Sequence, residues 1–416
     1  MNIPYEKIFK TIALLTPLKF RKSIREIGAT LSCKQGLTNN AKKVKSKLKT
    51  KKCLNVLFVC SECAKWKSQS LYDLMKTDPY FNPNICVTIP YSKDFKQKEY
   101  FDNLNFFKSK NIDVLEGYIP ETNEFIQFET FNPDIIFYEQ PYANQVNQAP
   151  EHCSEFSLSY YVPYFLPNQT SSLEYGYNFH LQMDKFFVLN ESIKTTYSKL
   201  MKNKGKNLVV VGHPTLDYFY LNKNQNKEKI YVIYAPHHSM NDKRTNFATF
   251  LWSGKFMLEW AKAHPEINWI FKPHPFLRVT IQDYWTDDEI KNYWNEWGKI
   301  AKICETSDYL DLFEESYAMI TDCGSFLTEF FMTIQPVIHL RREDSVHFNE
   351  TVTKITDTYY KAYNLDELNS LLEKIIIQKN DTLKENRAKL LTLLDFCNTY
   401  ASENIINEIK KEFLYD

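Results

Sequence analysis

From Cys53 onward, short apolar segments of strand length alternate with stretches of helical periodicity. The apolar segments of the first half are residues 53–60, 84–91, 133–142, 155–165 and 185–191. Most are apolar over consecutive positions, which is typical of parallel strands covered by helices on both faces. We therefore expect a doubly wound α/β domain here.

The second half repeats this alternation. Its candidate strands lie within residues 207–217, 229–238, 268–275, 301–305, 318–331 and 336–342. Because a basic stretch at Lys202–Lys206 separates the two halves, we place a first domain at 53–205 and a second doubly wound domain at 206–380. Leucine-rich helical periodicity then predicts a C-terminal helical segment at 381–416.

The first 52 residues differ from the rest in charge. They contain 14 Lys/Arg and two acids, so this stretch carries +12 although the whole chain is neutral. Apolar and basic residues alternate in it, which predicts short basic amphipathic helices. One interpretation is an extension that docks on an anionic membrane surface. The other is a solvated linker with a helix packed on the first domain.

Composition removes several function classes. The body of the chain has no basic excess, so we expect no nucleic-acid partner. The nine glycines are too widely spaced for a Walker loop or a G-x-G-x-x-G fingerprint, so any phosphate must be held by other means. Nine scattered cysteines, no secretory signal and no apolar run of 18 residues favour a reduced, cytoplasmic protein.

Four polar motifs follow predicted strands of the second half. They are Gly212-His213-Pro214, Ala235-Pro236-His237-His238, Lys272-Pro273-His274-Pro275 and Thr321-Asp322-Cys323-Gly324-Ser325. The carboxyl ends of parallel strands meet at one edge of a sheet, where open α/β domains bind ligands. We therefore expect these motifs to form one site.

The last motif joins a strand to a helix. Ser325 is a good N-cap residue, and Gly324 permits a tight turn or a close backbone approach. The free N–H groups of a helix start favour a phosphate. An ordinary N-cap without a ligand explains the same residues.

The histidines allow more than one interpretation. His274, held between two prolines, and Lys272 are suited to contacting a diphosphate, and His274 to protonating a leaving oxygen. His237 and His238 are suited to holding phosphate or acceptor, although one of two neighbouring histidines usually points away from a cleft. A rim histidine that bonds only locally is the alternative.

A metal site has weaker support. Cys60, Cys63, His152 and Cys153 offer four zinc-ligand types. Cys60, however, ends an apolar strand, and a single C-x-x-C arises easily by chance. We expect no metal.

Over residues 185–345 the ordered motifs GHPTLD, YAPHH, KPHP, DYLDLF, ITDCGSFLTEF and PVIHLRR resemble the CDP-glycerol glycerophosphotransferase family of teichoic-acid primases and polymerases. The resemblance implies a GT-B fold, two Rossmann-like domains facing a cleft, with the nucleotide donor held by the second domain. It implies no cofactor besides the nucleotide-linked substrate.

The resemblance also implies roles for individual residues. His274 would lie beside the donor phosphates, and Asp322, Gly324 and Ser325 would line the diphosphate, with Gly324 where the family commonly has serine. The other donor-side candidates are Gly212, His213, His237, His238, Lys272, Thr321, Glu329 and Arg341. For Glu329 an exposed helix charge, and for Arg341 a solvated strand end, are the alternatives.

The first half departs from the family pattern. The polymerases carry a Trp-His-Gly motif whose histidine is thought to be the base, and no Trp-His pair occurs here. At what we take as the corresponding strand end stands Glu139, which is suited to accept a proton from an acceptor hydroxyl. A structural carboxylate is the alternative.

These features together predict a transferase on the inner face of the cell membrane. It would move a polyol-phosphate from a CDP-linked donor to a hydroxyl of a glycan or lipid-linked acceptor, such as teichoic acid or capsule, and release CMP. Two alternatives remain: a nucleotide-sugar-dependent GT-B glycosyltransferase, and a non-catalytic member of a glycan assembly complex.

Overall fold

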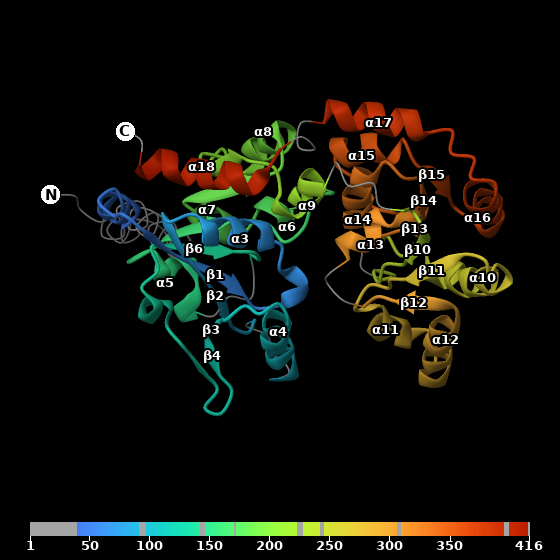
Figure 1. Cartoon of the computed structure of the whole chain (residues 1–416), viewed down its shortest axis with the longest axis horizontal. Coiled ribbons are helices and arrows are strands. Elements are labelled where there is room, and N and C mark those ends of the chain that lie inside the picture. The colour runs from blue at the N-terminus through green and yellow to red at the C-terminus, as the bar shows by residue number, and fades with distance from the viewer. Residues whose placement is uncertain are drawn as a thin grey trace, which may run out of the picture.

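The computed structural model describes residues 40–90, 97–141, 146–169, 172–222, 228–241, 245–305, 309–394 and 399–414. Two parallel sheets dominate it (Figure 1). The first has the order β3-β2-β1-β6-β7-β8-β9 and the second the order β12-β11-β10-β13-β14-β15. The expectation of two doubly wound α/β domains is confirmed.

The first sheet is built from short, largely buried strands. They are β1 (Leu54–Cys60), β2 (Phe81–Val87), β3 (Leu115–Glu116), β6 (Ile135–Tyr138), β7 (Leu158–Tyr161), β8 (Lys185–Val188) and β9 (Leu208–Val210). Its helices are α3 (Gln69–Thr77), α4 (Gln97–Ser109), α5 (Pro150–Cys153), α6 (Ser172–Tyr175), α7 (Asn178–Gln182), α8 (Glu191–Leu200) and α9 (Pro214–Asn222). A small hairpin, β4 (Tyr118–Ile119) and β5 (Glu124–Phe125), projects from the sheet.

The second sheet is built in the same way. Its strands are β10 (Tyr231–Ala235), β11 (Asn268–Phe271), β12 (Ala301–Ile303), β13 (Ser316–Thr321), β14 (Val337–Leu340) and β15 (Tyr360–Ala362). Its helices are α10 (Phe250–Ala263), α11 (Leu277–Thr280), α12 (Asp287–Ile300), α13 (Leu310–Glu314), α14 (Gly324–Glu329), α15 (Glu350–Thr356), α16 (Leu365–Leu372) and α17 (Lys384–Leu393). Stacked aromatic rings, such as Phe271 on Trp297 at 4.7 Å, fill the core between sheet and helices.

The boundary predicted between residues 205 and 206 is wrong by one strand and one helix. β9 pairs in parallel with β8, so residues 208–210 complete the first sheet. α9 follows and also packs on the first domain, against α3. The apolar residues of a strand do not indicate which sheet the strand joins. The chain crosses to the second domain only after α9.

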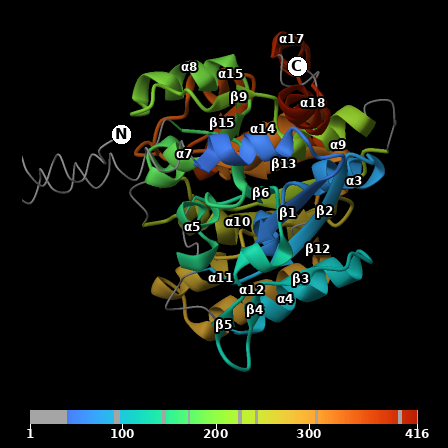
Figure 2. The ribbon, with the colours of Figure 1, turned by 90° about the vertical axis from the view of Figure 1, so that its left-hand side faces the viewer.

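The last helix returns to the first domain. α18 (Ala401–Phe413) packs against α3 and α9, as Figures 1 and 2 show. Ile405, Ile409 and Phe413 lie in the same buried cluster as the first sheet. The Asp217 carboxylate accepts hydrogen bonds from the backbone N–H groups of Ala401, at 2.7 Å, and Ser402, at 3.0 Å, which caps the start of α18. The predicted segment 381–416 is therefore split between the domains, with α17 on the second.

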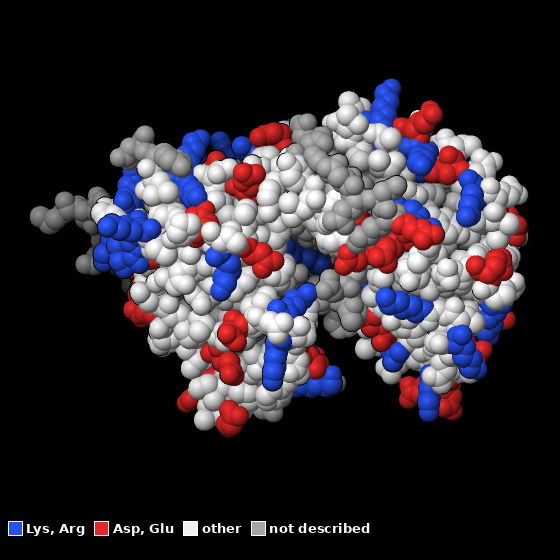
Figure 3. All heavy atoms as spheres, in the orientation of Figure 1, with Lys and Arg blue, Asp and Glu red and all other residues white. Residues whose placement is uncertain are grey.

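Part of the basic extension is packed on the first domain. Residues 40–48 are helical, and Val44 and Leu48 are buried in the first-domain core. Lys45 pairs with Glu412 at 2.6 Å. The lysines of this helix that remain exposed are Lys42, Lys43 and Lys47, on the side where Figure 3 shows basic residues gathered. The prediction for residues 1–39 lies outside the described residues.

No helix in the described part of the chain has both the length and the apolar character needed to cross a membrane.

Candidate active site between the domains

Three of the four predicted motifs meet at one edge of the second sheet. β11, β10 and β13 are neighbours and run parallel, so the residues after Phe271, Ala235 and Thr321 emerge side by side. The ring centroids of His238 and His274 are 4.1 Å apart, and those of His237 and His274 are 4.9 Å apart. The expectation that one of the paired histidines points away is wrong, because both contact His274.

His274 is held as a neutral hydrogen-bond donor. Burial, together with the positive charges that His238 and Lys272 would carry, lowers its pKa to about 3. Its Nδ1 atom accepts a hydrogen bond from the backbone N–H of Phe276 at 3.1 Å. The ring proton of neutral His274 therefore sits on Nε2, which is suited to donate to an anionic oxygen.

The same three histidines form the metal-ligand cluster found among the described residues. Their ring nitrogens lie within 4.8 Å of one another, so small rotations would bring them around a transition-metal ion. The hydrogen bond to Nδ1 of His274 occupies one lone pair and leaves the other nitrogen protonated, which favours an anion over a metal. Cys60, Cys63, His152 and Cys153 are not brought together as a cluster in the described structure.

Lys272 belongs to a buried cluster that reaches across both domains. Its ammonium lies 4.3 Å from the centre of the Tyr309 ring, and burial lowers its pKa. The Tyr309 hydroxyl donates to the Glu329 carboxylate at 2.6 Å. From the first domain, Lys67 Nζ donates to the same hydroxyl at 3.2 Å. Two lysines thus flank one tyrosine ring where the domains meet.

Glu329 is a buried member of this cluster and not an exposed helix charge. Its side chain is within the core, and burial raises its pKa while Lys67 and Lys272 oppose the rise. Lys67 and Tyr309 were missed as site residues in the sequence. Lys67 follows the carboxyl end of β1, so the strand-end rule applied to the first domain would have found it.

The buried side chains of Asp322 and Thr321 hydrogen-bond to neighbouring segments at the carboxyl edge of the second sheet. The Asp322 carboxylate accepts from His237 N at 2.6 Å, from Thr249 N at 2.6 Å and from Thr249 Oγ1 at 2.7 Å. The Thr321 hydroxyl donates to Ala235 O at 2.7 Å. Both side chains are buried and turned inward, so they position the loops that carry the histidines, and their predicted place against a diphosphate stays a prediction.

Gly324 begins α14, and the preceding Cys323 is its N-cap without a side-chain cap hydrogen bond. The predicted N-cap role of Ser325 is therefore wrong; Ser325 lies one position inside the helix. A Cβ on Gly324 would come within 2.7 Å of Asn168 Nδ2, from the first domain. A side chain here would press on the Asn168 amide, so glycine allows the two domains to approach closely at this point.

Gly212 and His213 do not belong with the other motifs. They follow β9, in the first domain. His213 is buried, its Nε2 lies 2.8 Å from Pro163 O, and burial lowers its pKa to about 4. Gly212 has a φ of +91°, and a Cβ there would meet Ala401 at 3.1 Å. Both residues shape the turn from β9 to α9, and their predicted donor-binding role stays a prediction.

Glu139 lies at the carboxyl end of β6, beneath the loop that carries Lys67. Its carboxylate accepts from Lys67 N at 3.4 Å, and burial raises its pKa to about 8. Arg341 follows β14, where its guanidinium lies 5.5 Å from the centre of the Phe348 ring. It is partly buried and not a solvated strand end.

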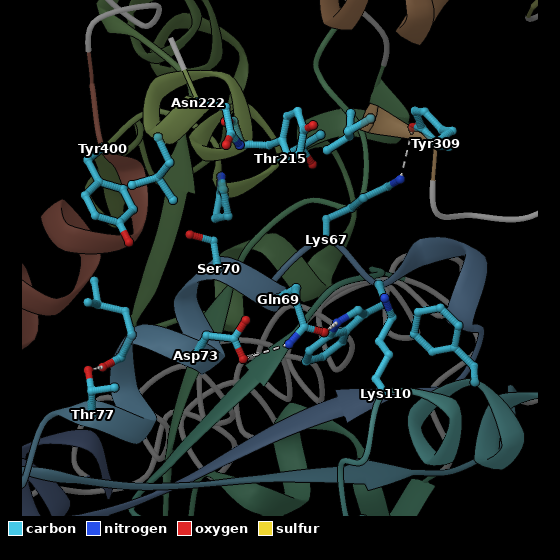
Figure 4. A pocket seen from close by; sticks show the side chains of 17 residues that line it. Lys67, Gln69, Ser70, Asp73, Thr77, Lys110, Thr215, Asn222, Tyr309 and Tyr400 are labelled. Atoms are coloured by element: carbon cyan, nitrogen blue, oxygen red, sulfur yellow. Dashed lines mark hydrogen bonds between the residues drawn. The ribbon is translucent and has the colours of Figure 1, made fainter. Parts of the chain in front are cut away.

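A cavity of about 490 Å³ opens beside this cluster (Figure 4). Its walls come from the loop after β1, from α3, α4 and α9, and from Tyr309 and Leu310 of the second domain. Lys67 and Tyr309 line the cavity and also belong to the Lys272 cluster, so the cavity and the cluster share these two residues as a common wall.

No protein-family model matches the chain, and no curated protein matches it in sequence. Solved structures match it in fold. A Listeria monocytogenes protein described as a UDP-N-acetylglucosamine 2-epimerase is 14% identical with a TM-score of 0.57, covering 88% of this chain and 97% of its own. The Neisseria meningitidis UDP-GlcNAc 2-epimerase bound to UDP-GlcNAc is 15% identical with a TM-score of 0.56, covering 86% and 100%. The Methanocaldococcus jannaschii enzyme in complex with UDP-GlcNAc and UDP is 14% identical with a TM-score of 0.52, covering 86% and 99%.

The chain thus has a GT-B-like fold of two Rossmann-like domains.

Proposed function

We propose that the chain is a nucleotide-sugar-dependent glycosyltransferase. The observation that carries this is the edge of β10, β11 and β13, where Lys272 and neutral His274 lie together in the second domain, next to a separate cavity. The Neisseria and Methanocaldococcus proteins of the same fold bind UDP-GlcNAc, which supports a nucleoside diphosphate as the group held there. An adjoining cavity favours transfer over epimerisation because a transferase needs room for a second substrate.

In this reaction the acceptor oxygen attacks the anomeric carbon of the donor sugar. The bond from that carbon to the diphosphate oxygen breaks, and the nucleoside diphosphate leaves with the electron pair. His274 Nε2–H would donate to a phosphate oxygen and the Lys272 ammonium would offset the developing charge. Glu139 would take the proton from the acceptor hydroxyl.

The second candidate is transfer of a polyol-phosphate from a CDP-linked donor. The ordered motifs around His274 and Ser325 favour it. Here the acceptor oxygen attacks the β-phosphorus and CMP leaves, so the same residues would stabilise charge on phosphate. A non-catalytic binding role would show itself as donor binding without turnover.

A calorimetric screen separates these functions. UDP-GlcNAc, other UDP-sugars, GDP-sugars, CDP-glycerol, CDP-ribitol, UDP and CMP are titrated into the full chain. We expect a UDP-sugar to bind in the micromolar range with a negative heat-capacity change. Binding of CDP-glycerol alone would select the second candidate. Failure of every nucleotide would refute both.

The pH dependence of turnover tests Glu139. Its pKa of about 8 keeps it mostly protonated at pH 7, and a base must be deprotonated. We therefore expect kcat/KM to rise about tenfold per pH unit below pH 8 and then level off. His274, with a pKa of about 3, is neutral throughout pH 5–9 and adds no inflection.

Glu139→Gln should abolish that inflection together with most of the activity. Glu174→Gln is the matched control, because Glu174 is also buried in the first domain with its pKa raised to about 7. It should leave the inflection at pH 8. A flat profile between pH 6 and 9 in the unmodified protein would contradict the role of Glu139 as base.

We also propose that the exposed lysines of residues 40–48 contribute to docking on anionic membranes. Each lysine near such a surface contributes about 1 kcal/mol, so changing Lys42, Lys43 and Lys47 to Gln should weaken binding about 100-fold. Vesicles containing phosphatidylserine provide the measurement. The control changes Lys255, Lys291 and Lys302, which are exposed on the second domain. Equal binding by both triple variants would rule out this surface.

A further inference from the structure

The cavity of about 490 Å³ between the domains has a composition that fits an uncharged, polyhydroxylated ring. We propose that it binds the saccharide part of the acceptor, an inference that rests on the proposed function. The volume is within the range of about 300–1,000 Å³ typical of small-molecule sites.

Aromatic side chains form much of the wall. Trp66, Phe106, Tyr218 and Tyr400 line the cavity from four separate segments. The Trp66 ring is fixed by an edge contact with Phe107 at 5.2 Å, so it is preorganised. The electron-rich face of an aromatic ring attracts the weakly positive C–H groups that one face of a pyranose presents.

One face of α3 supplies hydrogen-bonding groups in fixed positions. Ser70, Asp73 and Thr77 recur at helical spacing and all line the cavity. Trp66 Nε1 donates to Gln69 Oε1 at 2.9 Å, and Gln69 Nε2 donates to Asp73 Oδ1 at 2.9 Å. The second of these hydrogen bonds engages one carboxylate oxygen of Asp73 and leaves the other oxygen for a ligand hydroxyl (Figure 4).

A threonine side chain forms part of the opposite wall. Thr215, at the start of α9, is 6% exposed and lines the cavity. Within the described part of the chain its Oγ1 atom has no hydrogen-bond partner. The oxygen itself is buried from the cavity, so it supplies no direct contact to a ligand there. Figure 4 shows Thr215 and Asn222 across the space from Ser70 and Asp73.

The charges around the cavity argue against a second nucleotide. Asp73 and Lys110 are of opposite sign, and the Lys110 charge acts on the Asp73 carboxyl. Lys67 is directed to the Tyr309 hydroxyl at the shared wall. The lining therefore carries one positive charge in excess, and the Lys67 ammonium that supplies it is already engaged at the Tyr309 hydroxyl, whereas the neighbouring cluster offers Lys272 as well.

The position of the cavity suits an acceptor. Tyr309 lines the cavity, and the Lys272 ammonium lies 4.3 Å from the centre of the Tyr309 ring. A sugar hydroxyl beside Tyr309 would thus lie next to the donor diphosphate. Leu221, which also lines the cavity, is 55% exposed, so this part of the wall borders solvent, into which a longer glycan would extend.

Saturation-transfer NMR on the full chain with excess UDP tests the proposal. The probes are methyl β-glucoside, methyl β-N-acetylglucosaminide and N,N′-diacetylchitobiose. We expect at least one to bind through its ring protons. Asp73→Ala removes the carboxylate and Thr77→Trp narrows the cavity, so each should weaken that binding at least tenfold. Lys76→Ala, on the same helix but outside the cavity, should leave it unchanged.

UDP affinity, measured on the same proteins, separates this inference from the proposed function. Unchanged UDP binding in Asp73→Ala and Thr77→Trp, with saccharide binding lost, supports both. Two outcomes would overturn the cavity assignment alone. In the first, the protein binds UDP but no saccharide. In the second, it binds saccharide, and the two substitutions do not change the saccharide affinity. Loss of UDP binding in these variants would place the nucleotide in the cavity and overturn the cavity assignment as well. If the unmodified protein bound saccharide but no nucleotide, and both substitutions abolished the saccharide binding, that result would support the cavity assignment and refute the proposed function.

Discussion

Replacing Lys272 by methionine is expected to lower kcat by about 10²–10³-fold, the usual cost of removing one group that stabilises developing charge. Lys272 is buried, its ammonium faces the Tyr309 ring, and it lies on the same strand end as His274. Methionine keeps the length and apolar contacts of the side chain but removes the charge. Because a buried ammonium is costly to desolvate, the folded state should not be weakened.

Lys302→Met is the matched control. Lys302 lies on β12, the strand beside β11, and is exposed. Its variant should retain full activity. A Lys272→Met protein with unchanged unfolding temperature and kcat within threefold of the unmodified protein would show that Lys272 does not act on the leaving group.

Asp322→Ala is expected to destabilise the protein by about 3–5 kcal/mol, because three buried donors lose their acceptor at once. These donors are the backbone N–H groups of His237 and Thr249 and the Thr249 hydroxyl. Urea unfolding measures the change. Asp344→Ala removes an exposed carboxylate from the same domain and should stay within about 0.5 kcal/mol of the unmodified protein.

This experiment also decides between the two roles considered for Asp322. If its carboxylate contacted the donor, as the sequence suggested, the variant would lose donor affinity at unchanged stability. A loss of stability below about 1 kcal/mol would contradict the structural role.

Much of the fold followed from the pattern of apolar positions. Buried parallel strands are apolar at successive residues, and this signal placed β1, β6, β10 and β11. The apolar pattern failed where the bounds of a strand depend on which strand lies beside it. The sequence pattern placed the start of the second strand at residue 84, whereas β2 begins at Phe81. Residue 83 is a proline, and prolines usually interrupt strands. Here β3 pairs only with Cys86 and Val87, so the missing N–H of Pro83 faces no neighbouring strand.

The candidate site was predicted in its outline but not in the direction of its side chains. The strand-end rule brought His237, His238 and His274 together, and their rings are in contact. It could not show that Asp322 turns inward, since the donors that hold it come from residues 237 and 249, distant in sequence. Lys67 and Tyr309 meet only across the two domains, a contact that no local pattern encodes.

A nucleoside diphosphate held against His274 at the edge of the second sheet would change the surroundings of that histidine ring. The most direct test is the ¹H–¹⁵N spectrum of the histidine rings with and without UDP, with the His274 signal assigned by its absence in His274→Ala. We expect the His274 Nε2–H resonance to shift on addition of UDP while the buried His213 signal stays in place. UDP binding that leaves the His274 resonance unchanged, or no binding at all, would contradict this placement of the diphosphate.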